Sequence, residues 1–288
     1  KLLDARSTNR HYYVTVNCQL STINCYMCRL LGYLGDPILL DSILYKPEHS
    51  LIVQSYQPRE MTSGILNADG FGIGWYHPNQ DTDPFTYKNT QPIWSDINLP
   101  SISRYVESGC ALAYVRSATS GQAVDLSNCQ PFQSGRFLFV HNGFVQNFRQ
   151  TLYRPIRDRF SDATYQSING TTDSEHIFGL FVNELTAANI TPEVALRNSL
   201  QTLAELAKGE EVEFSANIIV SDGRQLVASR FASPKTPPSL YWIRDDLNFP
   251  KAVIIASEPL FAGNWHECPA QSIISTGGDG EIEIYPIL

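Results

Sequence analysis

The pattern of the chain changes at one stretch, Met27-Cys28-Arg29-Leu30-Leu31-Gly32-Tyr33-Leu34-Gly35. Residues 1–26, which precede it, show no clear helical or strand periodicity. They also lack the apolar core and the small-residue cleavage site of a signal peptide. We therefore expect residues 1–26 to be an N-terminal extension that the active protein does without. The extension is either a propeptide or the product of a misassigned start, and the second is favoured because one of only two methionines stands at this boundary.

The composition limits the class of partner. Of the 288 residues, 43% are hydrophobic and 17% are charged, as in an ordinary soluble globular protein. The net charge of -8 argues against nucleic acid or an anionic membrane as a partner, because phosphate binding requires a basic surface. No apolar run approaches the roughly 20 residues that span a bilayer. We expect a cytoplasmic protein that acts on a small-molecule substrate.

The six cysteines give no strong signal for a metal or for disulfides. Cys25 and Cys28 have CxxC spacing, but a second pair or a histidine cluster would be needed to predict zinc with any strength. Without a secretory signal, the thiols are expected to be reduced. We expect no metal and no cofactor.

Strand and helix patterns indicate antiparallel sheets covered by helices. A short helix is predicted over 36–45, where Asp36-Pro37 has the pattern of a helix start. Short apolar runs predict strands before and after two further helices, and Asp222-Gly223 predicts a hairpin. This order does not suit a repeating βαβ array. The predicted strands are 71–76, 111–115, 137–140, 214–220, 225–231, 252–257 and 281–285, and the other helices are 173–185 and 192–208.

Five motifs in sequence order carry a resemblance to a known family. They are Met27-Cys28-Arg29-Leu30-Leu31-Gly32, Asn67-Ala68-Asp69-Gly70-Phe71-Gly72-Ile73-Gly74-Trp75-Tyr76, Ala113-Tyr114-Val115-Arg116-Ser117-Ala118-Thr119-Ser120-Gly121, His141-Asn142-Gly143 and Thr172-Asp173-Ser174-Glu175. In this order they resemble the class II glutamine amidotransferases, whose chains begin at a nucleophilic cysteine. They are most similar to stand-alone members such as the γ-glutamyl hydrolase of ergothioneine biosynthesis.

The resemblance implies a fold and a domain. The implied fold is α+β, the four-layer αββα sandwich of N-terminal-nucleophile (Ntn) hydrolases, in which helices flank two stacked, mainly antiparallel sheets. Residues 28–288 are then expected to form a single glutamine amidotransferase type-2 domain.

Cys28 is the implied catalytic nucleophile. Once Met27 is removed, the α-amine of Cys28 becomes free, with an ordinary pKa of about 7.7–8.0 next to a thiol of about 8.5. A base active near neutral pH would then lie beside the thiol. The alternative is a buried structural cysteine that follows an arbitrary methionine.

Asn142 and Gly143 are implied to form the oxyanion hole, through the Asn side-chain NH2 and the Gly backbone N–H. The alternative is a plain Asn-Gly turn after the predicted strand 137–140. No chemistry is assigned to His141, which is expected to orient this loop or to form hydrogen bonds in the core.

Arg116, Thr119 and Asp173 are the implied substrate-binding residues. A guanidinium suits bidentate binding of the substrate α-carboxylate, and Asp173 would bind the α-ammonium. Together they would specify the zwitterionic end of a γ-glutamyl group. The alternatives are a surface salt bridge for Arg116 and a helix N-cap for Asp173.

The sequence also departs from the family pattern. Synthase-type members carry Trp and His at the positions of Ser117 and Ser120, so the departure favours the stand-alone branch. We predict cysteine-dependent hydrolysis of a γ-glutamyl amide, either glutamine or a γ-glutamyl conjugate such as an ergothioneine precursor, through a γ-glutamyl thioester. Three alternatives stay open: a glutaminase subunit that supplies ammonia to a separate partner synthase, a cysteine hydrolase of other acyl amides, and a non-catalytic γ-glutamyl-binding module.

Two further segments resemble functional motifs. The Gly-rich segment 67–75 lacks the Lys-Ser/Thr that a phosphate-binding loop requires. Ser257-Glu258-Pro259 resembles another family segment that follows a strand, and no chemistry is assigned to it.

Overall fold

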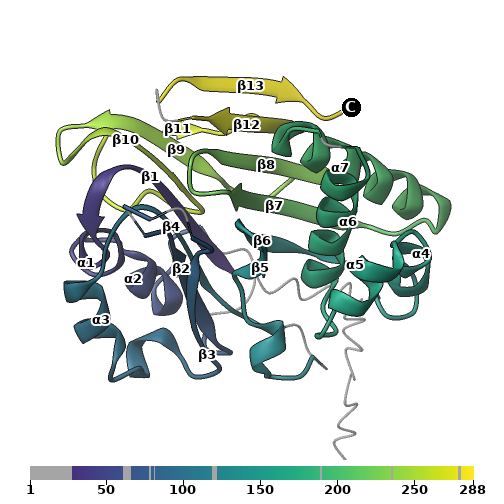
Figure 1. Ribbon diagram of the computed structural model, residues 1–288, viewed down its shortest axis with the longest axis horizontal. Coiled ribbons are helices and arrows are strands. Elements are labelled where there is room, and N and C mark those ends of the chain that lie inside the picture. The colour runs from purple at the N-terminus through teal and green to yellow at the C-terminus, as the bar shows by residue number, and fades with distance from the viewer. Residues whose placement is uncertain are drawn as a thin grey trace, which may run out of the picture.

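A computed structural model of the chain describes residues 28–60, 66–77, 79–80, 82–118, 122–188, 190–234, 236–277 and 280–288. The predicted extension, 1–26, lies outside these ranges. Two antiparallel sheets stack face to face, and helices cover the outer face of each (Figure 1). The four layers confirm the predicted α+β, αββα architecture.

The first sheet has seven described strands in the order β11-β9-β10-β1-β4-β2-β3. The long central pair, β1 and β4, runs antiparallel, with Leu30 opposite Tyr114. The strands are β1 (Arg29–Leu39), β2 (Phe71–Trp75), β3 (Phe85–Asn89), β4 (Glu107–Val115), β9 (Tyr241–Asp246), β10 (Phe249–Ala256) and β11 (His266–Glu267).

The second sheet has six described strands in the order β13-β12-β8-β7-β6-β5. Its central strands are apolar and buried, as their runs of Ile, Val, Phe and Ala require. The strands are β5 (Phe132–Ser134), β6 (Phe137–Val145), β7 (Phe214–Ser221), β8 (Leu226–Ser233), β12 (Ser272–Thr276) and β13 (Ile282–Pro286).

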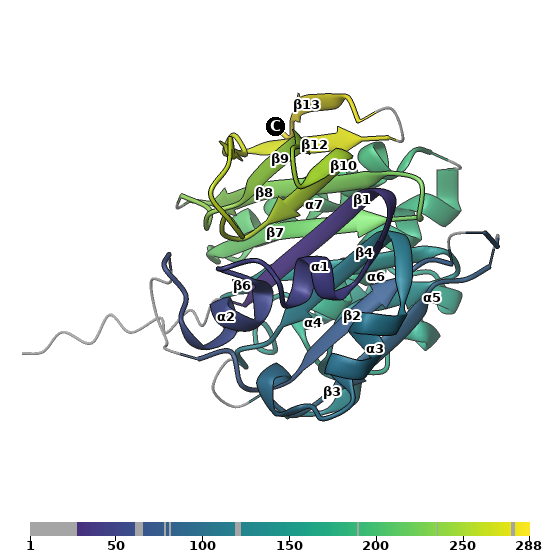
Figure 2. The ribbon, with the colours of Figure 1, turned by 90° about the vertical axis from the view of Figure 1, so that its left-hand side faces the viewer.

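The helices form the two outer layers, as the view in Figure 2 shows together with Figure 1. Short helices pack on the first sheet, and the two long helices pack on the second. The helices are α1 (Asp41–Leu44), α2 (Leu51–Tyr56), α3 (Leu99–Tyr105), α4 (Tyr153–Arg157), α5 (Asp162–Ser167), α6 (Asp173–Ala188) and α7 (Pro192–Gly209), with 3-10 turns η1 (Ile93–Ser95) and η2 (Leu126–Asn128).

The two-residue period of the strands assigns each side chain to a layer. In β1, Leu30 and Leu34 join the cluster between the sheets, whereas Leu31 and Tyr33 join the cluster beneath α1, α2 and α3. Cys28 belongs to the same cluster as Leu30, two residues on. The alternation of β1 therefore directs the predicted nucleophile into the space between the sheets.

The helix predicted over 36–45 is largely wrong. Residues 36–39 continue β1 beyond an irregularity in its pairing with β4 between Leu34 and Ile38, and only Asp41–Leu44 is helical. Pro37 has no N–H to give to a strand ladder, and a bulge accommodates such a residue. The Asp36-Pro37 pair therefore marks a break in strand pairing, which the sequence pattern does not distinguish from a helix start.

Candidate active site

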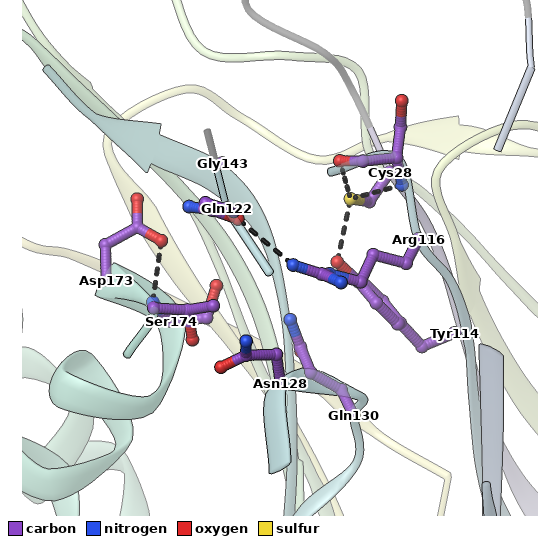
Figure 3. Close-up of a pocket in the computed structure, with 11 residues that line it drawn as sticks. Cys28, Tyr114, Arg116, Gln122, Asn128, Gln130, Gly143, Asp173 and Ser174 are labelled. Carbon is purple, nitrogen blue, oxygen red and sulfur yellow. Dashed lines mark hydrogen bonds between the residues drawn. The ribbon is translucent and has the colours of Figure 1, made fainter. Parts of the chain in front are cut away.

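A polar pocket opens at the end of β1 and β4, between the two sheets. Four of the predicted site residues meet there, namely Cys28, Arg116, Gly143 and Asp173. Cys28 and Arg116 come from the first sheet, and Gly143 and Asp173 come from the second sheet and its helix layer (Figure 3). The remaining lining residues are Tyr114, Ser117, Gln122, Asn128, Gln130, Thr172 and Ser174.

The Cys28 sulfur is buried and held by three hydrogen bonds. The Tyr114 hydroxyl donates to Sγ at 2.7 Å, and the Ser117 N–H donates to it at 3.3 Å. As a thiol, Sγ donates in turn to the Ser117 carbonyl oxygen at 3.5 Å. Burial raises the pKa of the Cys28 thiol, while the contacts from Tyr114 and Ser117 and the positive charge of Arg116 oppose that rise. The net effect favours the protonated thiol, so a base would be needed to form the thiolate.

Asn142 and Gly143 lie inside β6, so the alternative of a turn after residue 140 is wrong. Both pair with β7, Asn142 opposite Asn217 and Gly143 opposite Ala216. The apolar run predicted only the first part of this strand, because the motif His141-Asn142-Gly143 interrupts the apolar pattern before Phe144 and Val145.

Strand β6 presents its odd-numbered N–H groups along the edge that faces away from β7. The His141 N–H donates to the Gln130 side-chain oxygen, and the Val145 N–H donates to Asp173 Oδ2 at 2.7 Å. Gly143 lies between these two residues and lines the pocket. The Gly143 N–H therefore also points away from β7, where a bound group could accept its hydrogen bond.

Only glycine fits at position 143. A Cβ there would lie 1.9 Å from the Ser215 carbonyl oxygen and 2.5 Å from His141 Nε2. The close approach of β7 thus fixes the residue type.

The Asn142 side chain has no hydrogen-bond partner in the described part of the chain, at either its amide nitrogen or its oxygen, although it is fully buried. Its even position in β6 directs it to the same face as Leu138 and Val140, which join Cys28 in the cluster between the sheets. An unpaired buried amide costs free energy, so this one calls for a functional reason.

The His141 ring faces the helix layer instead. Its Nδ1 lies 2.8 Å from Ser174 Oγ in α6, and its Nε2 lies 3.2 Å from the Ser215 carbonyl oxygen. Burial lowers the pKa of His141. These contacts are the core hydrogen bonds expected of this residue.

Arg116 follows β4 directly and is 3% exposed. Its Nη1 donates to the carbonyl oxygens of Ala123 at 3.2 Å and Asp69 at 3.4 Å, and its Nη2 donates to Gln122 Oε1 at 3.2 Å. Across the residues that the structure describes, this buried cation contacts only neutral oxygens. A surface salt bridge is therefore the wrong interpretation of Arg116.

Asp69 holds the backbone on both sides of Ser117 by two hydrogen bonds. Its N–H donates to the Arg116 carbonyl oxygen at 3.0 Å, and its Oδ2 accepts the Ala118 N–H at 2.8 Å. The Asn67–Trp75 motif thus serves the site through its backbone and this one carboxylate.

Asp173 is the first residue of α6, and the preceding residue caps the helix. Thr172 Oγ1 accepts the Glu175 N–H at 3.2 Å, so the N-cap interpretation of Asp173 is wrong. Asp173 Oδ1 accepts the Ser174 N–H at 2.9 Å, and Oδ2 accepts from Val145. The carboxylate is 6% exposed and lines the pocket. Thr119 lies outside the described residues.

A buried ionic network supports Cys28 from the helix side of the first sheet. Arg29 Nη1 donates to the Cys28 carbonyl oxygen at 3.0 Å, and its Nε and Nη2 reach Glu258 Oε1 at 2.9 and 2.7 Å. Glu258 Oε2 also lies 2.6 Å from His49 Nε2. Although burial alone would raise the pKa of Glu258, these contacts and the Arg59 and Glu60 N–H groups hold it at about 2.

Glu258 and Tyr114 lie in segments that the motifs include or resemble, but neither residue was given a role from the sequence. Glu258 is a charged residue two positions after the apolar strand β10, and Tyr114 is a polar-tipped residue within β4. A polar or charged residue within or just after an apolar strand is the signal that could have identified them, because functional side chains often lie where strands of a rigid sheet end.

Within the described ranges, no cluster of three or more His, Cys, Asp or Glu side chains could hold a metal ion. None of the helices described there is long and apolar enough to cross a bilayer.

Comparison with known proteins gives consistent matches. Residues 27–252 match the family model of class-II glutamine amidotransferases. The chain is 32% identical to the Saccharomyces cerevisiae protein named "Probable glutamine amidotransferase DUG3", over 86% of this chain and 81% of that protein. It is 28% identical to the γ-glutamyl-hercynylcysteine sulfoxide hydrolase of Mycolicibacterium smegmatis, over 91% of this chain and 100% of that protein. A solved glutamine aminotransferase class-II domain protein from Silicibacter pomeroyi superposes with a TM-score of 0.66 at 25% identity, covering 90% of this chain and 99% of that chain.

Proposed function

The chain belongs to the class II glutamine amidotransferases, an enzyme family of Ntn-type amidohydrolases, and on that premise we propose that it hydrolyses a γ-glutamyl amide through a thioester on Cys28. The observation that carries this proposal is the pocket where Cys28, Arg116, Gly143 and Asp173 meet. We further propose that residues 28–288 form one catalytic domain and that the active chain begins at Cys28.

The first step is attack of the Cys28 thiolate on the γ-carbonyl carbon. The free α-amine takes the thiol proton, because its ordinary pKa lies near neutrality. The protonated amine then gives that proton to the leaving nitrogen as the C–N bond breaks. Water hydrolyses the thioester, which releases glutamate and restores the thiol.

The oxyanion that forms in both steps would accept hydrogen bonds from the Gly143 N–H and the Asn142 side-chain NH2. The direction of the Gly143 N–H along the pocket edge supports this role. The unpaired state of the buried Asn142 amide in the described structure supports it as well. Such preorganised donors stabilise the charge that develops in the transition state.

The glutamyl group would be recognised at both ends of its zwitterion. Arg116 is a buried cation beside neutral acceptors, which suits a substrate carboxylate, and Asp173 is a buried carboxylate that suits an ammonium. Gln122 Oε1 accepts the Nη2 hydrogen bond that the carboxylate would take, so we expect Gln122 to move aside when substrate binds. Thr119 is proposed as a further substrate contact on the basis of its motif.

Glutamate release from glutamine and from γ-glutamyl conjugates tests this proposal. Cys28→Ala removes the nucleophile, so release should fall to background, whereas Cys268→Ala, a change at a buried cysteine that does not line the pocket, should retain activity. Undiminished release by Cys28→Ala would contradict the proposal.

The same assay separates the other candidate functions. Arg116→Ala should raise the KM for γ-glutamyl substrates, whereas a hydrolase of other acyl amides would not require that cation. Activity that rises with an added synthase would indicate a glutaminase subunit. Binding without turnover by a chain that starts at Cys28 would indicate a non-catalytic module.

A further inference from the structure

We propose that Tyr114 is a further catalytic residue, whose hydroxyl group donates a hydrogen bond to the Cys28 sulfur and stabilises the thiolate that attacks the substrate. The inference rests on the proposed role of Cys28 as nucleophile. It assigns to the Tyr114 side chain a direct contact with the reacting atom.

The pairing of β1 with β4 brings the two groups together. Tyr114 lies opposite Leu30, and Cys28 lies two residues before Leu30 on the same face of β1. Diagonal neighbours across an antiparallel pair are within reach of a long aromatic side chain. The Tyr114 hydroxyl oxygen accordingly lies 2.7 Å from Cys28 Sγ. Figure 3 shows this hydrogen bond as a dashed line.

Packing explains the Tyr114 ring but not its hydroxyl. The ring belongs to an apolar cluster with Leu112, Leu138 and Val140, in which a phenylalanine would serve equally. The side chain is 3% exposed, so water has little access to the hydroxyl. Among the described residues, its hydrogen-bond partner is the Cys28 sulfur. A buried hydroxyl with that one partner is best explained by the chemistry of the sulfur.

The phenol is suited to remain a donor. Burial, followed by the negative charge of a Cys28 thiolate, raises the pKa of Tyr114 well above its ordinary value, so the proton stays on oxygen at any working pH. On the sulfur, the Tyr114 hydrogen bond is the largest of the contacts that counter the rise in pKa caused by burial. The Ser117 N–H is the second donor, and it is fixed in the backbone.

The transfer of the proton follows from these contacts. The thiol proton goes to the base, and the Tyr114 O–H and Ser117 N–H remain as two donors to the sulfur anion. Charge-assisted hydrogen bonds of this kind are roughly twice as strong as neutral ones. When the thioester forms, the sulfur loses its charge and the hydrogen bond from Tyr114 weakens. The hydrogen bond therefore stabilises the thiolate more than it stabilises the thioester.

Alkylation of Cys28 by iodoacetamide tests the inference without requiring turnover. The rate is measured against pH in the full chain, from the mass of the Cys28 peptide. Tyr114→Phe should raise the apparent pKa of Cys28 by about one to two units. The free energy of a hydrogen bond to a charged group corresponds to a pKa change of about that size. Tyr76→Phe is the matched control: its buried hydroxyl donates to the Arg136 and Ser221 carbonyl oxygens, and the pKa of Cys28 should stay unchanged.

A second variant reverses the sign of the effect. Replacing Tyr114 by 3-fluorotyrosine makes the phenol a stronger donor and should lower the apparent pKa of Cys28, even if Tyr114→Phe folds poorly. An apparent pKa that neither variant moves, or that Tyr76→Phe moves equally, would overturn the inference. The proposed function fails separately, if Cys28→Ala still releases glutamate.

Discussion

At the scale of single residues, the pocket and the strand beside it hold buried polar groups that stability alone does not explain. Asn142 is a fully buried amide with neither of its side-chain atoms paired in the described structure. Arg116 is a buried cation that contacts neutral oxygens. A buried polar group held in this way costs folding free energy, and a bound ligand with complementary groups would offset that cost.

Asn142→Ala should separate activity from stability. The rate of glutamate release should fall about 100- to 1,000-fold, as when one oxyanion donor is lost. The free energy of unfolding should change by less than about 1 kcal/mol or rise, because no hydrogen bond is broken. Glutamate-release kinetics and urea denaturation measure the two quantities.

The matched control is Asn217, which lies opposite Asn142 on β7. Its Nδ2 donates to the carbonyl oxygens of Pro238 and Ser239 at 3.0 and 3.1 Å. Asn217→Ala should therefore lower the free energy of unfolding by about 1–3 kcal/mol. If Asn142→Ala loses as much stability as Asn217→Ala, the Asn142 amide has a structural role instead.

At the scale of elements, Glu258 ties three segments together. It follows β10, pairs with Arg29 in β1, and accepts the Arg59 and Glu60 N–H groups at 2.9 and 3.1 Å after α2. Arg29 in turn holds the carbonyl group of Cys28. The carboxylate therefore positions the backbone at the start of β1.

Glu258→Gln should weaken this junction. Removing one partner of a buried ion pair leaves an uncompensated charge on Arg29 and should lower the free energy of unfolding by about 3–5 kcal/mol. Denaturant titrations of both proteins at pH 7 measure the difference. A loss below about 1 kcal/mol would contradict the account of the network.

The same carboxylate predicts a pH dependence. Its folded pKa of about 2 lies below the ordinary unfolded value of about 4.3, so its stabilisation is complete above the unfolded value. As the pH falls from about 4.3 to about 2, the wild type should lose this contribution. The Glu258→Gln protein should show a shallower loss over that window.

Sequence patterns predicted the elements that are apolar and regular. The strands at Phe71–Trp75 and Phe214–Ser221 and the helix Pro192–Gly209 were predicted because burial and periodicity agree there. The bulge after Leu34 and the polar end of β6 were missed, because backbone pairing and function override local pattern at these points.

The candidate site was predictable in part. The motifs indicated Cys28, Arg116 and Asp173, which the fold brings to one pocket. The spacing of residues along the chain does not indicate which side chains of neighbouring segments contact one another. For that reason the Tyr114 contact and the link between Arg29 and Glu258 emerged only from the pairing of strands.

At the scale of the whole molecule, the stacking of the two sheets creates the pocket. The first sheet contributes Cys28 and Arg116, and the second contributes Gly143, with Asn142 next to it in β6 but not among the lining residues. Neither sheet alone holds both the proposed nucleophile and the proposed oxyanion donors. Activity is therefore expected to depend on the packing between the two sheets.

The most direct test of the central claim is the mass of the Cys28 peptide after brief incubation with a γ-glutamyl substrate and acid quenching, using protein purified from its own cell. We predict a peptide that begins at Cys28 and carries one glutamyl group on sulfur. Two results would contradict this prediction in protein that releases glutamate. One is a glutamyl group on a residue other than Cys28, and the other is a Cys28 peptide that still contains Met27.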